Sequence, residues 1–298
     1  MEDQISEDSL LTRIAGGEII VSDGATGTNL QMLGLPVGAA AESWVLENPD
    51  AVLKLNQAFI DAGAQILLTC TFGGTPIRLA ASGLGDEFEK INLKAIEITQ
   101  AAVNGKDVLV AGSIGPTGHM LAPLGDLTPQ EAEDDFEAQA RLLSEGGVDL
   151  IVIETQFDLN EALAAVKGVR KATADLPVVC SFSFDRGTRT MMGVKPQEVA
   201  EVMNDLPVDI LGINCGRGLD ENLEALKQLR GETHKPIWFK PNAGMPEIGD
   251  DGKPRYSLQP AEMGALVPLW LKAGAQIVGG CCGTSPAHLA AIAQAVHA

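Results

Sequence analysis

The amino-acid sequence predicts an α/β protein that folds as a single (β/α)8 barrel, a TIM barrel, over residues 1–298. A short apolar, β-branched run followed by a loop and a helical segment recurs eight times along the chain. The runs are almost continuously apolar, which is typical of strands buried on both faces of a parallel sheet. No low-complexity linker divides the chain, so we expect one domain. A doubly wound open sheet is the alternative, but eight units are the number that closes a barrel.

The expected strands follow directly from the apolar runs. These runs lie at residues 18–24, 64–72, 107–115, 149–155, 176–184, 208–216, 235–242 and 275–283. The segment AGAQI occurs at residues 62–66 and again at 273–277, each time where a helical segment passes into a strand. This echo indicates a repeated βα unit.

Several expected helices carry start and stop signals. A capping residue followed by proline marks the beginning of a helix, and glycine marks its end. The clearest examples are Asn48-Pro49 with Gly63, Thr128-Pro129 with Gly146, and Ser285-Pro286. Strands and helices therefore alternate along the chain, as a barrel requires.

Composition excludes several classes of function. The 298 residues carry a formal net charge of -19, which would repel nucleic acid and anionic membranes. No stretch of 18 apolar residues is present, so no membrane-spanning helix is expected. The acidic, polar N-terminus does not look like a targeting signal, which favours a cytoplasmic location. There, thiols stay reduced, and five cysteines do not indicate a disulfide framework.

The carboxyl ends of the expected strands carry most of the reactive side chains, whereas the strand beginnings carry few. In a (β/α)8 barrel the active site forms at these carboxyl ends. The two longest connections, residues 24–48 and 243–259, also follow strand ends, and loops of this length are often functional. The strand ends carry Asp23-Gly24, Thr69, Ser113, Glu154, Ser183, Asn214-Cys215, Lys240 and Cys281-Cys282.

Three cysteines near these strand ends are candidate metal ligands. Cys215 ends the sixth strand and Cys281-Cys282 end the eighth, so one strand separates them and the ends lie roughly 10 Å apart. Neighbouring residues of a regular strand point to opposite faces, but the glycines at 279, 280 and 283 permit a turn that brings both sulfurs to one ion. Three thiolates with an open fourth position match a catalytic zinc site. The alternative is three ordinary buried cysteines, which is what we expect of Cys70 and Cys180.

A zinc ion held by three thiolates would suit one kind of reaction. A substrate thiol that arrives at the open position would lose its proton and bind as the thiolate, which is the nucleophilic form. We therefore expect activation of a substrate thiol for attack on an electrophilic carbon.

Six segments together resemble a known family. VSDGATGTNLQ, GAQILLTCTFGG, AGSIGPTG, DLIVIETQFDLNEA, GINCG and GGCCGTSPAHL are similar to the homocysteine S-methyltransferase domain. The resemblance covers roughly residues 19–298 and itself implies a (β/α)8 barrel. It also implies that Cys215, Cys281 and Cys282 are the zinc ligands and catalytic residues, and that homocysteine sulfur takes the fourth position.

The same resemblance implies contacts to the amino-acid end of homocysteine. Asp23, Gly24 and the backbone N–H groups from Ala25 onward match the family's DG motif. Thr69 matches a residue that contacts the substrate carboxylate, and Glu154 matches the acidic residue at the substrate amino group. Asn214 precedes the first zinc ligand and is expected to support the substrate or metal site. The bland alternative for Asp23 is a loop cap, whereas Glu154 would be costly to bury unpaired.

The methyl donor is less well determined. The sequence ends after one barrel, without a second barrel or a cobalamin module, and its motifs look most like the methionine synthase branch. We therefore expect methylcobalamin on a separate corrinoid protein as the donor, in a split methionine synthase. S-methylmethionine is the alternative. Betaine ranks lower for two reasons: Gly73 stands where betaine enzymes carry tyrosine, and an aromatic box for its ammonium group could be formed only by Trp44, Phe72 and Tyr256. Residues 185–193 are a candidate donor-side loop.

Two other classes of protein stay open. One is a barrel lyase or aldolase that uses Glu154 with Lys240 as a Schiff-base lysine, although this would leave the three cysteines unexplained. The other is a non-catalytic partner subunit that binds no homocysteine. His119, in the loop after the third strand, is a minor candidate for the site.

Overall fold

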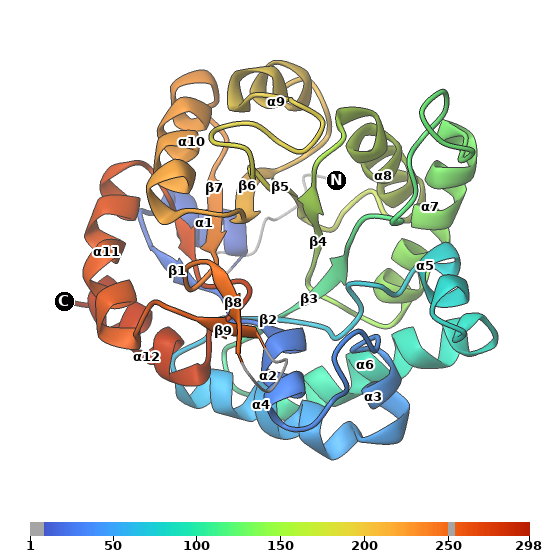
Figure 1. Cartoon of the computed structure of the whole chain (residues 1–298), viewed down its shortest axis with the longest axis horizontal. Coiled ribbons are helices and arrows are strands. Elements are labelled where there is room, and N and C mark those ends of the chain that lie inside the picture. Colours follow the sequence, from blue (N-terminus) through green and yellow to red (C-terminus); the bar gives the residue numbers. More distant parts are fainter. Residues whose placement is uncertain (1–8, 250–253) are drawn as a thin grey trace, which may run out of the picture.

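A computed structural model describes residues 9–249 and 254–298 and confirms the predicted barrel. Eight parallel strands form one sheet in the order β1-β10-β7-β6-β5-β4-β3-β2. They surround the centre of the molecule and helices form the outer layer (Figure 1). Residues 1–8 of the N-terminus that suggested a cytoplasmic location, and residues 250–253 of the long connection after the seventh strand, lie outside the described residues.

Each strand lies inside the apolar run that predicted it or extends one residue past it. The barrel strands are β1 (Ile20–Val21), β2 (Ile66–Leu68), β3 (Leu109–Ile114), β4 (Leu150–Gln156), β5 (Val178–Phe182), β6 (Ile210–Cys215), β7 (Ile237–Pro241) and β10 (Ile277–Val278). The sheet is nearly closed between β1 and β2, where Ser22 and Ile66 form a parallel bridge. Backbone hydrogen bonds from Gln65 to Val21 (2.7 Å) and from Asp23 to Ile66 (3.0 Å) reinforce this seam.

The long helices that follow the strands make the outer layer. They are α4 (Pro49–Asp61), α6 (Phe88–Val103), α7 (Pro129–Glu145), α8 (Leu159–Ala172), α9 (Pro196–Met203), α10 (Leu219–Glu232), α11 (Pro260–Lys272) and α12 (Pro286–Val296). The predicted start of α7 is confirmed, because the Glu131 N–H donates to Thr128 Oγ1 and Glu131 Oε2 accepts from the Thr128 N–H. Asn48 precedes α4 as expected, but its side chain makes no capping hydrogen bond.

Several short elements were not predicted from the sequence. The connection 24–48 contains α2 (Thr26–Met32) and α3 (Ser43–Glu47), and the connection 243–259 contains an antiparallel pair, β8 (Pro246–Ile248) and β9 (Pro254–Tyr256). Further short helices are α1 (Leu10–Ala15), α5 (Pro76–Ala81) and the 3-10 helix η1 (Gly85–Glu87). One or two turns give too few residues for a periodic apolar pattern, so the sequence could not reveal them.

The interior of the barrel is filled by apolar side chains. Leu10 and Ile14 of α1 are buried in the same cluster as Ile20, Leu150 and Trp238 of the strands. Two larger clusters lie between the strands and the outer helices. The polar residues at the carboxyl ends of the strands therefore sit above a packed core.

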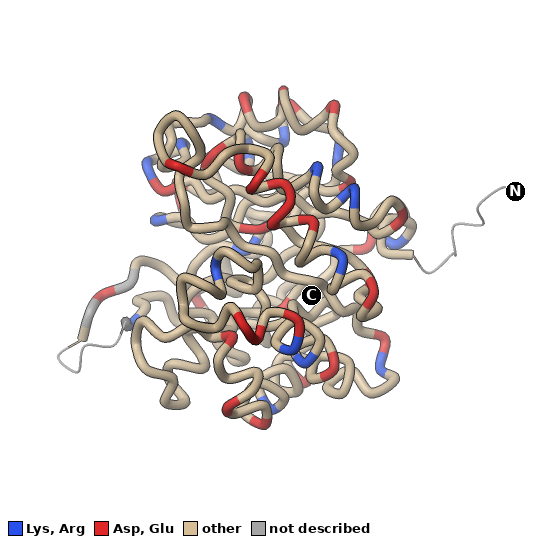
Figure 2. The backbone as a smooth tube through the Cα atoms, turned by 90° about the vertical axis from the view of Figure 1, so that its right-hand side faces the viewer, with Lys and Arg blue, Asp and Glu red and all other residues tan. Residues whose placement is uncertain are grey.

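The surface is acidic. Asp and Glu are spread over helices and loops and are interleaved with fewer Lys and Arg residues (Figure 2). Among the described residues no helix combines the length and the apolar character needed to cross a bilayer. The expected lack of a nucleic-acid partner stays a prediction.

Candidate active site

A cavity of about 710 Å³ opens at the carboxyl ends of the strands. Its wall is contributed by β2, β3, β4, β6, β7 and the segment after β10, and it extends to the connection after β1 and to α5. The predicted site residues that line it are Gly24, Ala25, Thr69, Glu154, Cys215, Cys281 and Cys282. Asp23 and Asn214 lie behind this wall and contact residues in it. The structure therefore brings all nine predicted residues to one place.

The sulfurs of Cys215, Cys281 and Cys282 lie within 4.8 Å of one another. Cys215 Sγ and Cys281 Sγ are 2.7 Å apart. Cys215 adopts a left-handed backbone conformation with φ 58°, and Asn222 fixes it by donating from Nδ2 to the Cys215 carbonyl at 2.6 Å. The side chains of Cys70 and Cys180 are buried, as expected, and neither belongs to this group.

The glycines around Cys281 and Cys282 act in two different ways. Gly283 has φ 82°, so it makes the turn that lets the adjacent thiols converge. At Gly279 a Cβ would lie 2.7 Å from the carbonyl oxygens of Ser22 and Asp23, and at Gly280 it would lie 2.3 Å from the Thr284 side chain. These two glycines are therefore required by close packing rather than by backbone conformation, which corrects the expectation that all three serve the turn.

The thiol group fits a metal ion of the kind that cysteines bind. Cys282 has its pKa lowered well below the usual value, mainly by S–H hydrogen bonds from Cys215 and Cys281, while the pKa of Cys215 is raised. Three converging thiols that share protons in this way are a donor set for a thiolate-binding cation, which would replace those protons. All three cysteines also line the cavity, so a fourth ligand could enter.

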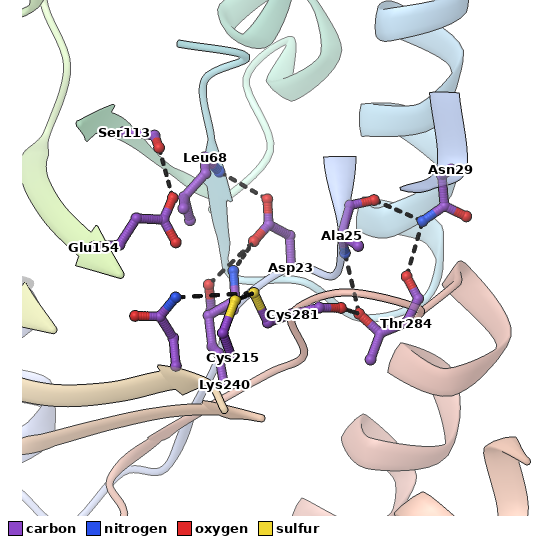
Figure 3. Close-up of polar contacts among 12 residues, drawn as sticks. Asp23, Ala25, Asn29, Leu68, Ser113, Glu154, Cys215, Lys240, Cys281 and Thr284 are labelled. Atoms are coloured by element: carbon purple, nitrogen blue, oxygen red, sulfur yellow. Dashed lines mark hydrogen bonds and ion pairs between the residues drawn. The ribbon is translucent and has the colours of Figure 1, made fainter. Parts of the chain in front are cut away.

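Helix α2, which the sequence did not predict, fastens the segment that holds Cys281 and Cys282. Asn29 Nδ2 donates to the carbonyl oxygens of Ala25 (2.6 Å) and Thr284 (2.8 Å), and the Ala25 N–H donates to Thr284 Oγ1 at 3.1 Å. Thr284 Oγ1 in turn donates to the Cys281 carbonyl at 2.6 Å. Figure 3 shows this chain of contacts beside the sulfurs.

Glu154 lies at the end of β4 and is 7% exposed. Ser113 donates to Glu154 Oε1 at 2.6 Å, and burial raises the pKa of Glu154 to about 7. This carboxylate lines the cavity, so it is placed to meet a cationic group of a ligand.

Asp23 forms an ion pair that the sequence did not predict. Lys240 Nζ lies 2.5 Å from Asp23 Oδ1, and both side chains are at most 3% exposed. The other oxygen of Asp23 accepts the Leu68 N–H at 2.9 Å. Although burial lowers the pKa of Lys240, the carboxylates of Asp23 and Glu154 outweigh it and the pKa is raised. A lysine held as the ammonium ion is poorly suited to Schiff-base formation, which disfavours the aldolase alternative.

Thr69 and Gly24 occupy the wall near this pair. Thr69 Oγ1 accepts the Ser113 N–H at 3.1 Å and lies 2.6 Å from Thr71 Oγ1. At Gly24 a Cβ would be 2.6 Å from the Phe59 ring, so only glycine fits there. The substrate contacts expected of Thr69, Gly24 and Ala25 stay predictions.

Asn214 supports the neighbouring strand ends. Its side chain is buried and bonds to Thr155 and to Ser181 Oγ, and its Nδ2 lies 3.8 Å from Cys281 Sγ. Ser113 and Ser183 lie at strand ends, but the sequence predicted no role for them in the site. Only their position at strand ends could have suggested one.

The remaining candidate residues for the site differ in whether they line the cavity. His119 is exposed and does not line the cavity. Phe72 lines the cavity with 36% of its surface exposed, whereas Trp44 packs against a core cluster. Tyr256 does not line the cavity either, and it lies near Cys282, where it helps to lower the pKa of that thiol. These three residues therefore do not form an aromatic box among the described residues.

Asp185 lies in a second, smaller cavity of about 350 Å³ that Cys215 also lines. Residues 185–193 therefore stay a candidate donor-side loop.

Known proteins share this architecture over most of the chain. Methionine synthases of Mycobacterium tuberculosis and Mycobacterium leprae are each 30% identical over 305 residues, covering 97% of this chain. The chain spans about a quarter (25%) of the length of these curated relatives. The solved structure of the homocysteine methyltransferase MmuM from Escherichia coli in its metallated form is similar with a TM-score of 0.77 at 27% identity, over 95% of this chain and 99% of that chain.

More distant structures agree in fold alone. A dihydrodipicolinate synthase from Bacillus anthracis, at 10% identity, superposes with a TM-score of 0.51. A model of the family described as homocysteine S-methyltransferase, in contrast, matches residues 20–296, which includes every residue of the site described above. The chain therefore belongs to the homocysteine S-methyltransferase family of enzymes.

Proposed function

We propose that this protein transfers a methyl group to the sulfur of homocysteine and so produces methionine. The observation that carries the proposal is the convergence of three cysteine sulfurs within 4.8 Å at a cavity whose wall also holds a buried carboxylate, Glu154. In the reaction an electron pair of the substrate sulfur forms the new S–CH₃ bond. The bond between methyl and donor breaks, and its electron pair leaves with the donor.

We propose zinc as the metal that Cys215, Cys281 and Cys282 hold, since three thiolates with an open position suit that ion. The existence of a metallated form of MmuM supports a metal in a relative of this fold. Bound zinc would allow the substrate thiol to react as a thiolate near neutral pH. A cytoplasmic location belongs to the same proposal, because a reducing compartment keeps these thiols available.

The chain's own residues would place the substrate. In this proposal Glu154 receives the ammonium group, and the cavity holds sulfur and methyl carbon in line while limiting water. The cavity extends past the sulfurs to Phe72, Gly73 and Arg78, so its wall has room for a donor beyond the amino acid. Pockets of about 300–1,000 Å³ accommodate ligands larger than a single amino acid.

Two donors are proposed in order. The first is methylcobalamin on a separate corrinoid protein, supported by the similarity to methionine synthases along 97% of this chain. The second is a small free donor such as S-methylmethionine, with betaine behind it. That alternative is supported by the match to MmuM over 99% of the length of that chain.

A donor panel tests the proposal. The zinc-loaded protein is incubated with homocysteine and, separately, with a methylated corrinoid protein, S-methylmethionine and betaine, and methionine is followed by mass spectrometry. We expect methionine with at least one donor and none with the Cys215→Ser variant. Methylation of a different thiol, with no methionine from any donor, would overturn the choice of acceptor.

A further inference from the structure

Lys240 is a buried cation at the site whose hydrogen-bonding capacity is only partly used. We propose that Lys240 binds the carboxylate of the amino-acid substrate and thereby selects α-amino-acid thiols over simple thiols, with Asp23 as the residue that positions it. This inference rests on the proposed function, because it concerns the same thiol substrate.

The position of Lys240 follows from the barrel. It lies on β7 in register with Asn214 of β6, near the carboxyl end of the strand, and it lines the cavity. Nζ lies 5.4 Å from the centroid of the Trp238 ring. Figure 3 shows Lys240 and Asp23 directed toward the same region as the cysteine sulfurs.

An ammonium group has three N–H donors. Among the described residues, Asp23 is the only hydrogen-bond partner of Lys240 Nζ, and the lysine is 3% exposed. A buried charge with unused donors is costly unless a further partner arrives. Because the group borders the cavity, the missing partner would be an anionic group of a ligand.

Thr69, the residue expected to contact the substrate carboxylate, has no hydroxyl proton left to donate to it. Thr71 donates its hydroxyl proton to the Ser113 carbonyl at 2.8 Å, so the 2.6 Å contact between Thr69 and Thr71 must use the proton of Thr69. The hydroxyl of Thr69 then has no proton for a carboxylate, which can only accept hydrogen bonds. The Ala25 N–H is likewise bonded to Thr284.

The charges at the site favour a zwitterionic ligand. Asp23 and Lys240 form an ion pair, and Glu154 adds a negative charge to the wall above its pKa of about 7. An α-amino acid brings one ammonium and one carboxylate. Glu154 can receive the first and the unused donors of Lys240 the second, so each buried group gains an opposite partner.

The test compares two thiols in two proteins. Homocysteine carries the carboxylate, and 3-aminopropane-1-thiol is the same molecule without it. The variant is Lys240→Met combined with Asp23→Asn, which removes both charges and avoids a lone buried carboxylate. Binding is measured by calorimetry on the metal-loaded proteins, and KM and kcat are measured with the donor that the panel identifies.

We expect the wild type to bind homocysteine more tightly than the aminothiol by about 10- to 100-fold, the value of a hydrogen bond between charged groups. The variant should lose this preference through weaker homocysteine binding, with aminothiol binding unchanged. Glu154→Gln serves as the matched control, because it should weaken both thiols alike.

Equal weakening of both thiols in the Lys240→Met, Asp23→Asn variant would overturn the inference, since a purely structural role predicts that result. Thermal melting and metal content confirm that the variant is folded and loaded. If the wild type makes no methionine but its calorimetric preference depends on Lys240, the proposed function fails and the carboxylate contact stands. If methionine forms and the preference for homocysteine survives the substitution, the carboxylate contact fails and the proposed function stands.

Discussion

Asn214 holds Thr155 through both ends of its side-chain amide. Its Oδ1 accepts the Thr155 N–H at 2.9 Å, and its Nδ2 donates to Thr155 Oγ1 at 2.7 Å. Thr155 and Cys215 both have left-handed backbones, with φ 61° and 58°, which is rare for residues with a side chain. One amide therefore fixes the end of β4 beside Glu154 to the end of β6 beside Cys215.

Replacing Asn214 by alanine should loosen both strand ends. The hydrogen bonds to Thr155 and Ser181 would be lost in a buried place, and the left-handed backbone of Thr155 would no longer be held. We expect the free energy of unfolding to fall by about 2–3 kcal/mol and metal affinity to fall about 10- to 100-fold. Chemical denaturation and competition with a chelator measure the two effects.

Asn204→Ala is the matched control. Asn204 bonds to the Glu232 carbonyl and to Thr233, away from the cavity. It should lose some stability and keep its metal affinity. A loss of stability without a loss of metal affinity in Asn214→Ala would show that the amide serves the fold alone.

The sequence predicted the barrel because its signals are local and repeated. An apolar run such as residues 149–155 and a start such as Thr128-Pro129 can be recognised without knowledge of the rest of the fold. The thiol group could be placed as well, since strand order brings the ends of β6 and β10 within one strand of each other.

The ion pair of Asp23 with Lys240 could not be predicted from the residues around either one. The two lie 217 positions apart, and their contact depends on the length and direction of two side chains in a closed barrel. The role of α2 was hidden for a similar reason. Asn29 acts by reaching Thr284, which is distant in the sequence and close only after the barrel has nearly closed.

Cys215→Ser should remove most of the bound metal, because a hydroxyl is a poor replacement for a thiolate ligand. Cys180→Ala is the matched control: Cys180 is fully buried in β5 and has no part in the thiol group. Elemental analysis after dialysis should give near-stoichiometric metal for the wild type and Cys180→Ala. Full metal retention in Cys215→Ser would contradict the proposed site.

Homocysteine binding should depend on pH through Glu154. Burial raises the pKa of this carboxyl to about 7, so the group is largely protonated below that pH and charged above it. Only the charged form attracts the substrate ammonium. Below the pKa, affinity should therefore rise about tenfold for each unit by which the pH increases. Above pH 7 it should level off.

Glu154→Gln isolates this effect. The amide cannot ionise, so the variant should bind homocysteine weakly and show no step near pH 7 in calorimetry. Metal content must be matched at each pH, because metal binding itself releases protons. A step of the same size in Glu154→Gln would assign the pH dependence to another group.

Gly283→Ala should damage both the fold and the metal site. A methyl group there would lie 2.1 Å from the Tyr256 ring, and the backbone has φ 82°. The left-handed conformation and the overlap together should lower the free energy of unfolding by about 2–4 kcal/mol. Because Gly283 turns the chain directly after Cys282, we also expect weaker metal binding.

Gly231→Ala is the matched control. Near the end of α10 a Cβ at this position meets no atom within 4 Å, and the backbone has no positive φ. This variant should raise the free energy of unfolding by less than about 1 kcal/mol. Thermal melting and chelator competition on both variants check this contrast, and equal behaviour of the two would show that the turn at Gly283 tolerates a side chain.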